Sequence, residues 1–227
     1  MIVNNFNNST TDSQYHSNDT LVLEPEEKIT RPKLPLKKTV KNNEVDHSLF
    51  KISVADDTHL DFVPMIIAEM EASARARGTG IAKRSEAYLR EKIHEGKAVI
   101  AFSATGQWAG FCYIESWEHG SYVANSGLIV APDFRKSGLA RFIKRRIFEL
   151  SRAKYPEAKI FGLTTGLAVM KINSELGYEP VTYSELTNDE AFWQGCSSCV
   201  NYDILQSKGR KNCLCTAMLY DPNEYEQ

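Results

Sequence analysis

The segment from Tyr122 to Leu150 restricts the fold more than any other part of the chain. Tyr122 to Ala131 alternates as an extended strand does, and Pro132 ends it. The helix that follows is amphipathic. Its apolar face carries Leu139, Phe142, Ile143, Ile147 and Leu150, and its basic face carries Arg141, Lys144, Arg145 and Arg146. Because another strand follows at Lys159 to Thr164, the helix has to cross over from one strand to the next.

The remaining periodicity predicts hairpins and a second crossover helix around this unit. The expected elements are a strand at Leu49–Val54, helices at Leu60–Ala76 and Ser85–Glu95, strands at Lys97–Phe102 and Trp108–Trp117, a helix at Ala168–Leu176, and strands at Pro180–Tyr183 and Leu214–Tyr220. This mixture of hairpins and crossovers favours an α/β (α+β) architecture, in which a central mixed sheet is flanked by helices.

The first 45 residues differ in composition from the rest of the chain. They are rich in Asn, contain three of the eight prolines and carry six positive charges between residues 28 and 41. Such a segment buries too little apolar surface to offset the entropy of ordering it. We expect a flexible, disordered tail over residues 1–45, with a basic docking arm as the functional alternative. The folded domain is expected at residues 46–227, with a cysteine-containing insertion at residues 187–212.

Charge and hydropathy exclude several classes of function. The chain has 27 Lys and Arg against 29 Asp and Glu, a net charge of −2, whereas a duplex-binding surface needs a basic excess. No apolar run approaches the roughly 20 residues of a membrane span, and the first twenty residues lack the pattern of a secretory signal. We therefore expect a cytoplasmic protein that binds neither nucleic acid nor membrane. A homodimer stays open.

The turn after Pro132 carries the clearest chemical signal. Arg135, Lys136, Ser137 and Gly138 stand where the next helix has unpaired backbone N–H groups and the positive end of its dipole, which together suit an anion. Gly138 and the small Ala140 let a phosphate approach the backbone closely. An ordinary turn with a solvated basic face is the alternative interpretation.

The order of these motifs resembles the GNAT superfamily of acyl-coenzyme A-dependent N-acyltransferases. The resemblance covers roughly Phe50 to Pro222, with its core at Leu128 to Ala140 and support from Asn173 to Tyr178. It implies a GNAT-like fold and acetyl- or succinyl-coenzyme A as co-substrate. By position, the implied pyrophosphate-binding residues are Arg135, Lys136, Ser137, Gly138, Leu139 and Ala140. The implied pantetheine-binding residues are Leu128, Ile129 and Val130, where a backbone N–H near Ile129 or Val130 would stabilise the reaction's oxyanion.

The sequence departs from the family at the position of the usual acid. Many members have a Tyr there that protonates the leaving thiolate, whereas this chain has Asn173, whose amide can bind sulfur or coenzyme but supplies no proton. Ser174, Tyr178 or water could take over that role. For the base that accepts the amine proton, Glu115 is the first candidate, followed by Glu118 and His119. A surface carboxylate at a strand end is the alternative for Glu115.

The segment between the first two helices suggests the acceptor. Arg75, Arg77, Lys83 and Arg84 lie within ten residues together with two glycines, which suits recognition of carboxylates. The alternative is a solubilising helix end. The run Arg77 to Arg84, Gly162 to Gly166 and the late cysteines resemble GNAT proteins associated with arginine biosynthesis in Bacteroidetes-type bacteria. That resemblance implies glutamate as the acceptor, acylated on its α-amine. A protein or peptide N-acetyltransferase and a non-catalytic acyl-coenzyme A sensor are the alternatives.

The last cysteines form two closely spaced pairs. Cys196 and Cys199 have C-x₂-C spacing, and Cys213 and Cys215 have C-x-C spacing, so the four could hold a structural zinc ion. Free thiols and a redox pair are the alternatives. Cys112, inside a predicted strand, is expected in the core.

Overall fold

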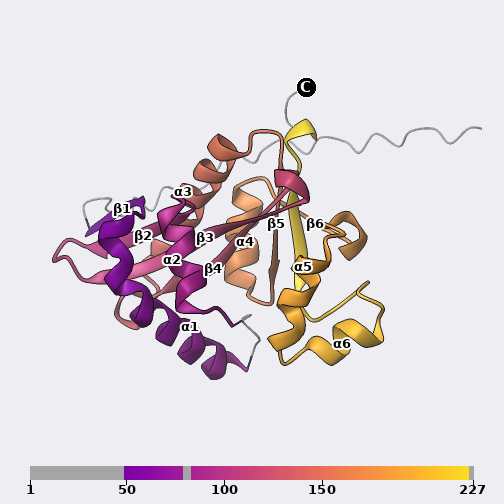
Figure 1. Cartoon of the computed structure of the whole chain (residues 1–227), viewed down its shortest axis with the longest axis horizontal. Helices are drawn as coiled ribbons and strands as arrows, with labels where there is room; N and C mark the ends of the chain where they lie inside the picture. The colour runs from indigo at the N-terminus through magenta and orange to yellow at the C-terminus, as the bar shows by residue number, and fades with distance from the viewer. Residues whose placement is uncertain (1–48, 79–82, 225–227) are drawn as a thin grey trace, which may run out of the picture. The chain divides into compact units, whose positions relative to one another are not determined.

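Seven strands form one sheet in the computed structural model, in the order β1-β2-β3-β4-β5-β7-β6 (Figure 1). The strands are β1 (Phe50–Val54), β2 (Ala98–Ser103), β3 (Trp108–Trp117), β4 (Tyr122–Val130), β5 (Lys159–Thr164), β6 (Glu179–Val181) and β7 (Thr216–Tyr220). β4 and β5 run parallel, whereas the other neighbouring strands are antiparallel. The structure describes residues 49–78 and 83–224, so the expected tail at residues 1–45 lies outside the described residues.

Six α-helices are described: α1 (Val63–Arg77), α2 (Glu86–His94), α3 (Leu139–Lys154), α4 (Leu167–Glu175), α5 (Glu190–Gln194) and α6 (Tyr202–Ser207). The prediction of a mixed sheet flanked by helices is confirmed. The first helix differs from its expected start, because a 3₁₀ turn, Asp57–Phe62, precedes it and Pro64 sits in its first turn. None of the helices in the described ranges is both long and apolar enough to cross a membrane.

Alternation along the strands divides the core into two layers. Phe111 and Tyr113 of β3 pack with α1 and α2 on one face, whereas Cys112 and Ile114 pack with α3 on the other. Trp193 of α5 and Leu205, in α6, join the first face over β5 and β7. The sheet is therefore covered by α1, α2, α5 and α6 on one side and by α3 and α4 on the other (Figure 1).

A bulge in β4 controls where the sheet opens. The β3–β4 register shifts at this point, and Gly127 has φ of 64°. β4 pairs with β5 only from Tyr122 to Ala124, although both strands continue beyond that point. Because a bulge bends and twists its strand, the two parallel strands diverge where each could have continued the ladder.

Lys144 is the clearest correction to the sequence prediction. It was placed on the solvated basic face of its helix, but it is 2% exposed, whereas Arg145 and Arg146 are exposed as expected. The buried surface of α3 includes Ile143, Lys144, Ile147 and Ser151, and is therefore wider than its apolar stripe. Lys144 therefore belongs to the buried face of α3.

We predict that Gly127→Ala destabilises the protein by about 3 kcal/mol or more, because a methyl group adds a clash to a left-handed backbone. Its Cβ would lie 2.3 Å from Tyr113 Cε1 and 2.9 Å from Met70 Cε. Urea unfolding measures the cost. Gly106→Ala is the matched control, because Gly106 has φ of 81° with no atom within 4 Å of the added Cβ. It should cost only about 1 kcal/mol, and equal costs for the two variants would contradict the packing argument.

Candidate functional site

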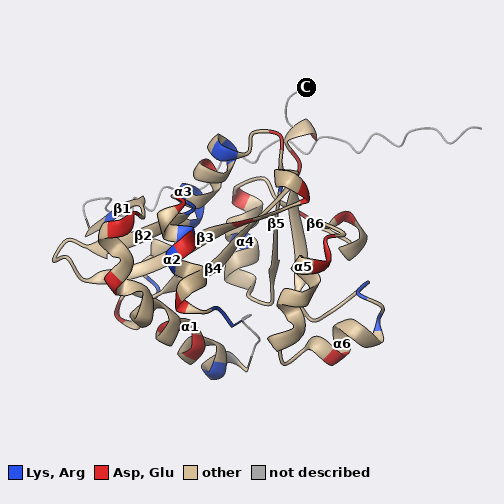
Figure 2. Ribbon diagram, viewed as in Figure 1, with Lys and Arg blue, Asp and Glu red and all other residues tan. Residues whose placement is uncertain are grey.

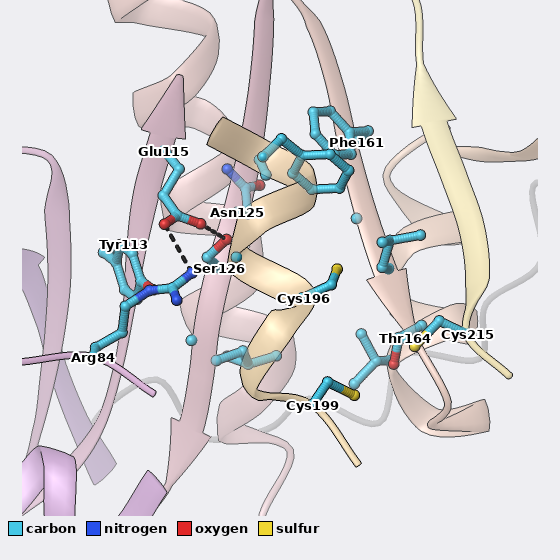
Figure 3. Close-up of a pocket in the computed structure, with 18 of the residues that line it drawn as sticks. Arg84, Tyr113, Glu115, Asn125, Ser126, Phe161, Thr164, Cys196, Cys199 and Cys215 are labelled. Atoms are coloured by element: carbon cyan, nitrogen blue, oxygen red, sulfur yellow. Dashed lines mark hydrogen bonds and ion pairs between the residues drawn. The ribbon is translucent and has the colours of Figure 1, made fainter. Parts of the chain in front are cut away.

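A cavity of about 710 Å³ lies where β4 and β5 diverge. Its walls come from β3, β4 and β5, from the segment that leads into α2, and from the insertion that contains α5 (Figure 3). Ser126 and Phe161 line it from one face of the sheet, and Asn125 and Lys144 line it from the other. The cavity therefore extends through the sheet, in the size range of small-molecule sites.

Glu115, the predicted base, lies buried in this cavity within a ring of donors. Its Oε1 accepts a hydrogen bond from Tyr88 OH at 2.6 Å. Oε1 also accepts one from Arg84 Nη2 at 3.0 Å, and Oε2 accepts one from Ser126 Oγ at 2.6 Å (Figure 3). Strand alternation explains the position, because Glu115 follows Phe111 and Tyr113 on the same face of β3. Glu115 is thus an ion-paired carboxylate at the cavity wall, and not a surface carboxylate at a strand end.

The guanidinium of Arg84 makes hydrogen bonds to other groups of the protein. Nε donates to Tyr113 OH at 2.8 Å, Nη2 donates to Glu115, and Nη1 donates to the Lys83 carbonyl at 3.4 Å. Burial, followed by the charge of Glu115, raises the pKa of the Tyr88 phenol, and burial likewise raises the pKa of Tyr113. Both phenols are therefore neutral at ordinary pH: Tyr88 donates to Glu115, whereas Tyr113 accepts from Arg84. Arg84 acts mainly to hold Glu115.

The other predicted acceptor-binding cations lie in different places. Lys83 is exposed and lines the cavity, and its backbone N–H donates to Ser198 Oγ at 3.1 Å, so this segment contacts the insertion. Arg75 is exposed on α1 and pairs with Glu71 at 3.6 Å. The side chain of Arg77 and the residues from Thr79 to Ala82 lie outside the described residues. Basic residues mark the segment just before α2 in Figure 2.

The predicted phosphate-binding turn connects β4 to α3. A 3₁₀ turn at Pro132–Phe134 is followed by Lys136 with φ of 65° and by Gly138, the residue before the helix, with φ of 85°. No side chain caps the helix from Gly138. Ser137 Oγ donates to the Phe134 carbonyl at 2.6 Å, which orders the turn. The first helical N–H, that of Leu139, donates to Ser137 Oγ at 3.4 Å, and Gly138 supplies no side-chain cap for the N–H groups that follow.

Of the residues assigned to the coenzyme by resemblance, only Leu128 lines the cavity. Arg135 pairs with Glu69 of α1, and Nε of Arg135 donates to the Val130 carbonyl at 3.3 Å. Leu128 lines the cavity, whereas Ile129 is 3% exposed in the α1–α2 layer and Val130 packs on the α3 layer. The side chains of residues 135–140 are not part of the cavity wall.

Asn173 and Tyr178 are both buried next to the cavity wall. Asn173 is 1% exposed; its Nδ2 lies 3.7 Å from Met218 Sδ, and within the described residues its Oδ1 has no hydrogen-bond partner. A buried acceptor without a donor costs about 1–3 kcal/mol. Tyr178 OH donates to Asn125 Oδ1 at 2.9 Å, and burial raises the pKa of this phenol well above its usual value. Tyr178 therefore holds the core and does not line the cavity.

The four late cysteines gather near Tyr183, but they do not form the predicted zinc site. Among residues 49–78 and 83–224, no group of three or more His, Cys, Asp or Glu side chains is arranged to hold a metal ion. Cys213 and Cys215 both precede β7, which begins at Thr216 and not at Leu214 as predicted. Burial raises the pKa of Cys196 to about 11 and of Cys215 to about 12, and neighbouring thiols add to both shifts. The structure therefore supports four half-buried free thiols, of which Cys196 and Cys215 are held neutral.

Several cavity residues were not predicted from the sequence. Tyr88, Tyr113 and Ser126 surround Glu115, and Phe192 of the insertion packs against Phe161 with ring centres 5.1 Å apart. Tyr113 was detectable in principle, since it stands two residues before Glu115 and shares its face. Ser126 and Phe192 reach the site through tertiary contacts that local spacing does not show.

The fold matches those of solved acetyltransferases. N-acetylglutamate synthase from Neisseria gonorrhoeae, complexed with coenzyme A and N-acetyl-glutamate, superposes with a TM-score of 0.54 at 18% identity, over 76% of this chain and 35% of that one. Rv2747 from Mycobacterium tuberculosis, in complex with CoA, gives 0.54 at 17% identity, over 75% of this chain and 98% of that one. The chain has the GNAT fold.

A third match is a GNAT superfamily phosphinothricin acetyltransferase from Sinorhizobium meliloti in complex with AcCoA, with a TM-score of 0.51 at 14% identity, over 76% of this chain and 88% of that one. The chain spans about a third of the Neisseria protein, and nearly all of the other two. No protein-family model and no curated protein matches the sequence. At these identities the similarity establishes a common fold.

We predict that Arg84→Met destabilises the protein by about 3 kcal/mol, because it leaves the Glu115 carboxylate buried without its cation. The Arg84→Met/Glu115→Gln double variant should recover most of this loss, since a neutral amide can keep the Tyr88 and Ser126 contacts. Thermal unfolding of the two single variants and the double variant completes the cycle. Additive losses would show that the pair is not coupled.

Proposed function

We propose that this protein is an acyl-coenzyme A-dependent N-acyltransferase. The observation that carries the proposal is the cavity that passes through the sheet where β4 and β5 diverge. One of its ends lies on the α3 side, beside Asn125 and Lys144, and the other lies on the α2 side, beside Glu115. A thioester and an amine could therefore enter from opposite faces and meet between the strands, with no covalent enzyme intermediate.

The α3 side suits the coenzyme. Beyond Ala124, β4 has no ladder partner on its β5 side within the described residues, so its backbone can pair with the amide groups of a pantetheine arm. Leu128 lies along this edge, and the turn from Arg135 to Ala140 follows at the helix N-terminus. Such a terminus binds a diphosphate through backbone N–H groups and the helix dipole.

The α2 side suits the amine. Glu115 faces the cavity with its oxygens already aligned by Tyr88, Arg84 and Ser126. The attacking ammonium has to lose a proton before or during attack. We assign Glu115 to accept this proton, directly or through a water molecule.

The acceptor is proposed to be a small acidic amine, with glutamate as the simplest case and arginine biosynthesis as the setting. Lys83 supports this proposal, because it is an exposed cation on the cavity wall with no carboxylate partner among the described residues. The contact between Lys83 and Ser198 also narrows the entrance to the cavity on this side. A narrow entrance favours a free amino acid over a peptide as the acceptor. The donor is acetyl- or succinyl-coenzyme A.

We predict that coenzyme A binds the protein, and that Gly138→Glu weakens its affinity by roughly 100-fold or more, because a carboxylate at the helix N-terminus repels the diphosphate. Isothermal titration calorimetry measures both affinities. Gly209→Glu is the control, because Gly209 also has positive φ, at 57°, lies in open surroundings and is not part of the cavity wall. It should bind coenzyme A as the unmodified protein does.

The assay for acyl transfer measures the coenzyme A thiol released from acetyl- or succinyl-coenzyme A in the presence of L-glutamate. L-glutamine and a lysine-containing peptide are tested as alternative acceptors. Release with glutamate above the other two supports the proposal. Faster release with the peptide would assign a peptide acyltransferase. Tight coenzyme binding without release for any acceptor would assign a binding module instead.

A further inference from the structure

We propose that Lys144 is the catalytic acid that protonates the departing thiolate of coenzyme A. This inference rests on the proposed function and deepens it, because it names a residue for the step that Asn173 leaves without a proton donor. Asn173 is an amide, and Tyr178, the nearby phenol, has its hydroxyl directed at Asn125 in the core. Neither of them lines the cavity, whereas Lys144 does.

The position of Lys144 relates it to the coenzyme side of the sheet. It belongs to α3, which covers the face opposite to α2 and Glu115. Its side chain nevertheless lines the cavity together with Asn125 and Gly162, residues that flank the point where β4 and β5 separate. The opening between the strands is therefore the route by which Lys144 reaches the cavity, from the side on which the thioester would enter.

The contacts of Lys144 leave its ammonium group without a counter-ion. The residue is 2% exposed, its Nζ lies 5.3 Å from the centre of the Tyr178 ring, and no carboxylate pairs with it among the described residues. The titratable groups facing it are Cys112 of β3 and Tyr178, and burial raises the pKa of Cys112 to about 11 and that of Tyr178 well above 10. Both are neutral at pH 7 to 9, so they do not fix the proton on Lys144.

Burial lowers the pKa of Lys144 from 10.5 to about 8, close to the ordinary pKa of a thiol. An acid works best when its pKa is near the working pH and near that of the group it protonates. An unperturbed lysine, in contrast, would hold its proton too tightly.

The step balances as follows. The neutral amine nitrogen forms a bond to the carbonyl carbon as the C=O π pair moves to oxygen. The nitrogen gives a proton to Glu115 or water, from which the proton passes to solvent. The oxygen then re-forms C=O as the C–S bond breaks, and the electron pair of that bond goes to sulfur. Sulfur takes the proton of the Lys144 ammonium and leaves as neutral thiol, and Lys144 regains a proton from solvent before the next turnover.

The first experiment needs no turnover. The protein is labelled with lysine carrying ¹³C at Cε, and the Lys144 resonance is assigned by its loss in Lys144→Met. We expect this resonance to titrate near pH 8 and to shift when coenzyme A saturates the protein. A midpoint above pH 10, or no shift at saturating coenzyme A, would overturn the proposal while leaving coenzyme binding established. If coenzyme A does not bind at all, the proposed function fails together with it.

The second experiment measures turnover of acetyl-coenzyme A with L-glutamate. Lys144→Met should lower kcat by about 100-fold or more, with the affinity for coenzyme A little changed, because the acid acts only as the C–S bond breaks. In the unmodified protein we expect kcat to fall above pH 8, where Lys144 loses its proton. The residual activity of Lys144→Met should not show this fall. Arg145→Met, an exposed neighbour on the same helix, controls for loss of a cation and should behave as the unmodified protein.

Lys144→Arg separates charge from proton transfer, since arginine keeps the charge but does not release its proton. It should be as slow as Lys144→Met. Full activity in either variant would overturn the proposal. Mass spectrometry after incubation with acetyl-coenzyme A gives the remaining outcome, because an acetyl group on Lys144 would make it an acceptor and not an acid.

Discussion

The separation of β4 and β5 is the constraint on which the rest of the structure depends. A parallel pair normally continues its ladder for as long as both strands last, and here it stops after Ala124 although β4 continues to Val130. A bulge bends its strand, and the one in β4 includes Gly127, whose left-handed backbone is tolerated because glycine has no Cβ to strike Tyr113. The resulting gap removes backbone hydrogen bonds from both strands. A ligand whose amides restore them would recover that free energy on binding.

The α2 side of the cavity depends on a second constraint, the burial of Glu115. A carboxylate in this position needs both a cation and neutral donors. It obtains them from three separate parts of the chain: Arg84 in the segment before α2, Tyr88 in α2, and Ser126 on β4. The same contacts hold α2 against the sheet. Arg84 therefore joins this wall of the cavity to β3.

Much of this architecture follows from local sequence, and the site does so only in part. Strand alternation located β3 and β5 at their observed bounds, and placed Glu115 on one face of the sheet. The periodicity of the sequence predicts the α3 helix correctly, but it places Lys144 on the wrong face. The width of the buried face of a helix depends on the elements that pack against it. The Arg84–Glu115 pair spans 31 residues, and the α5–α6 insertion has no clear period of its own. Contacts of this kind come from the tertiary fold, and local spacing does not contain them.

The burial of Lys144 lowers the stability of the folded protein at neutral pH. A pKa lowered from 10.5 to about 8 means that the folded state destabilises the charged form by about 3 kcal/mol. Below pH 8 both states hold the proton and the full cost applies; between pH 8 and 10.5 the folded state has released it while the unfolded chain keeps it, so stability from this group rises with pH. Methionine would fill the same space without that cost. A fold that retains the ammonium at the cavity wall gives up stability at neutral pH, as expected where a group has chemistry to perform.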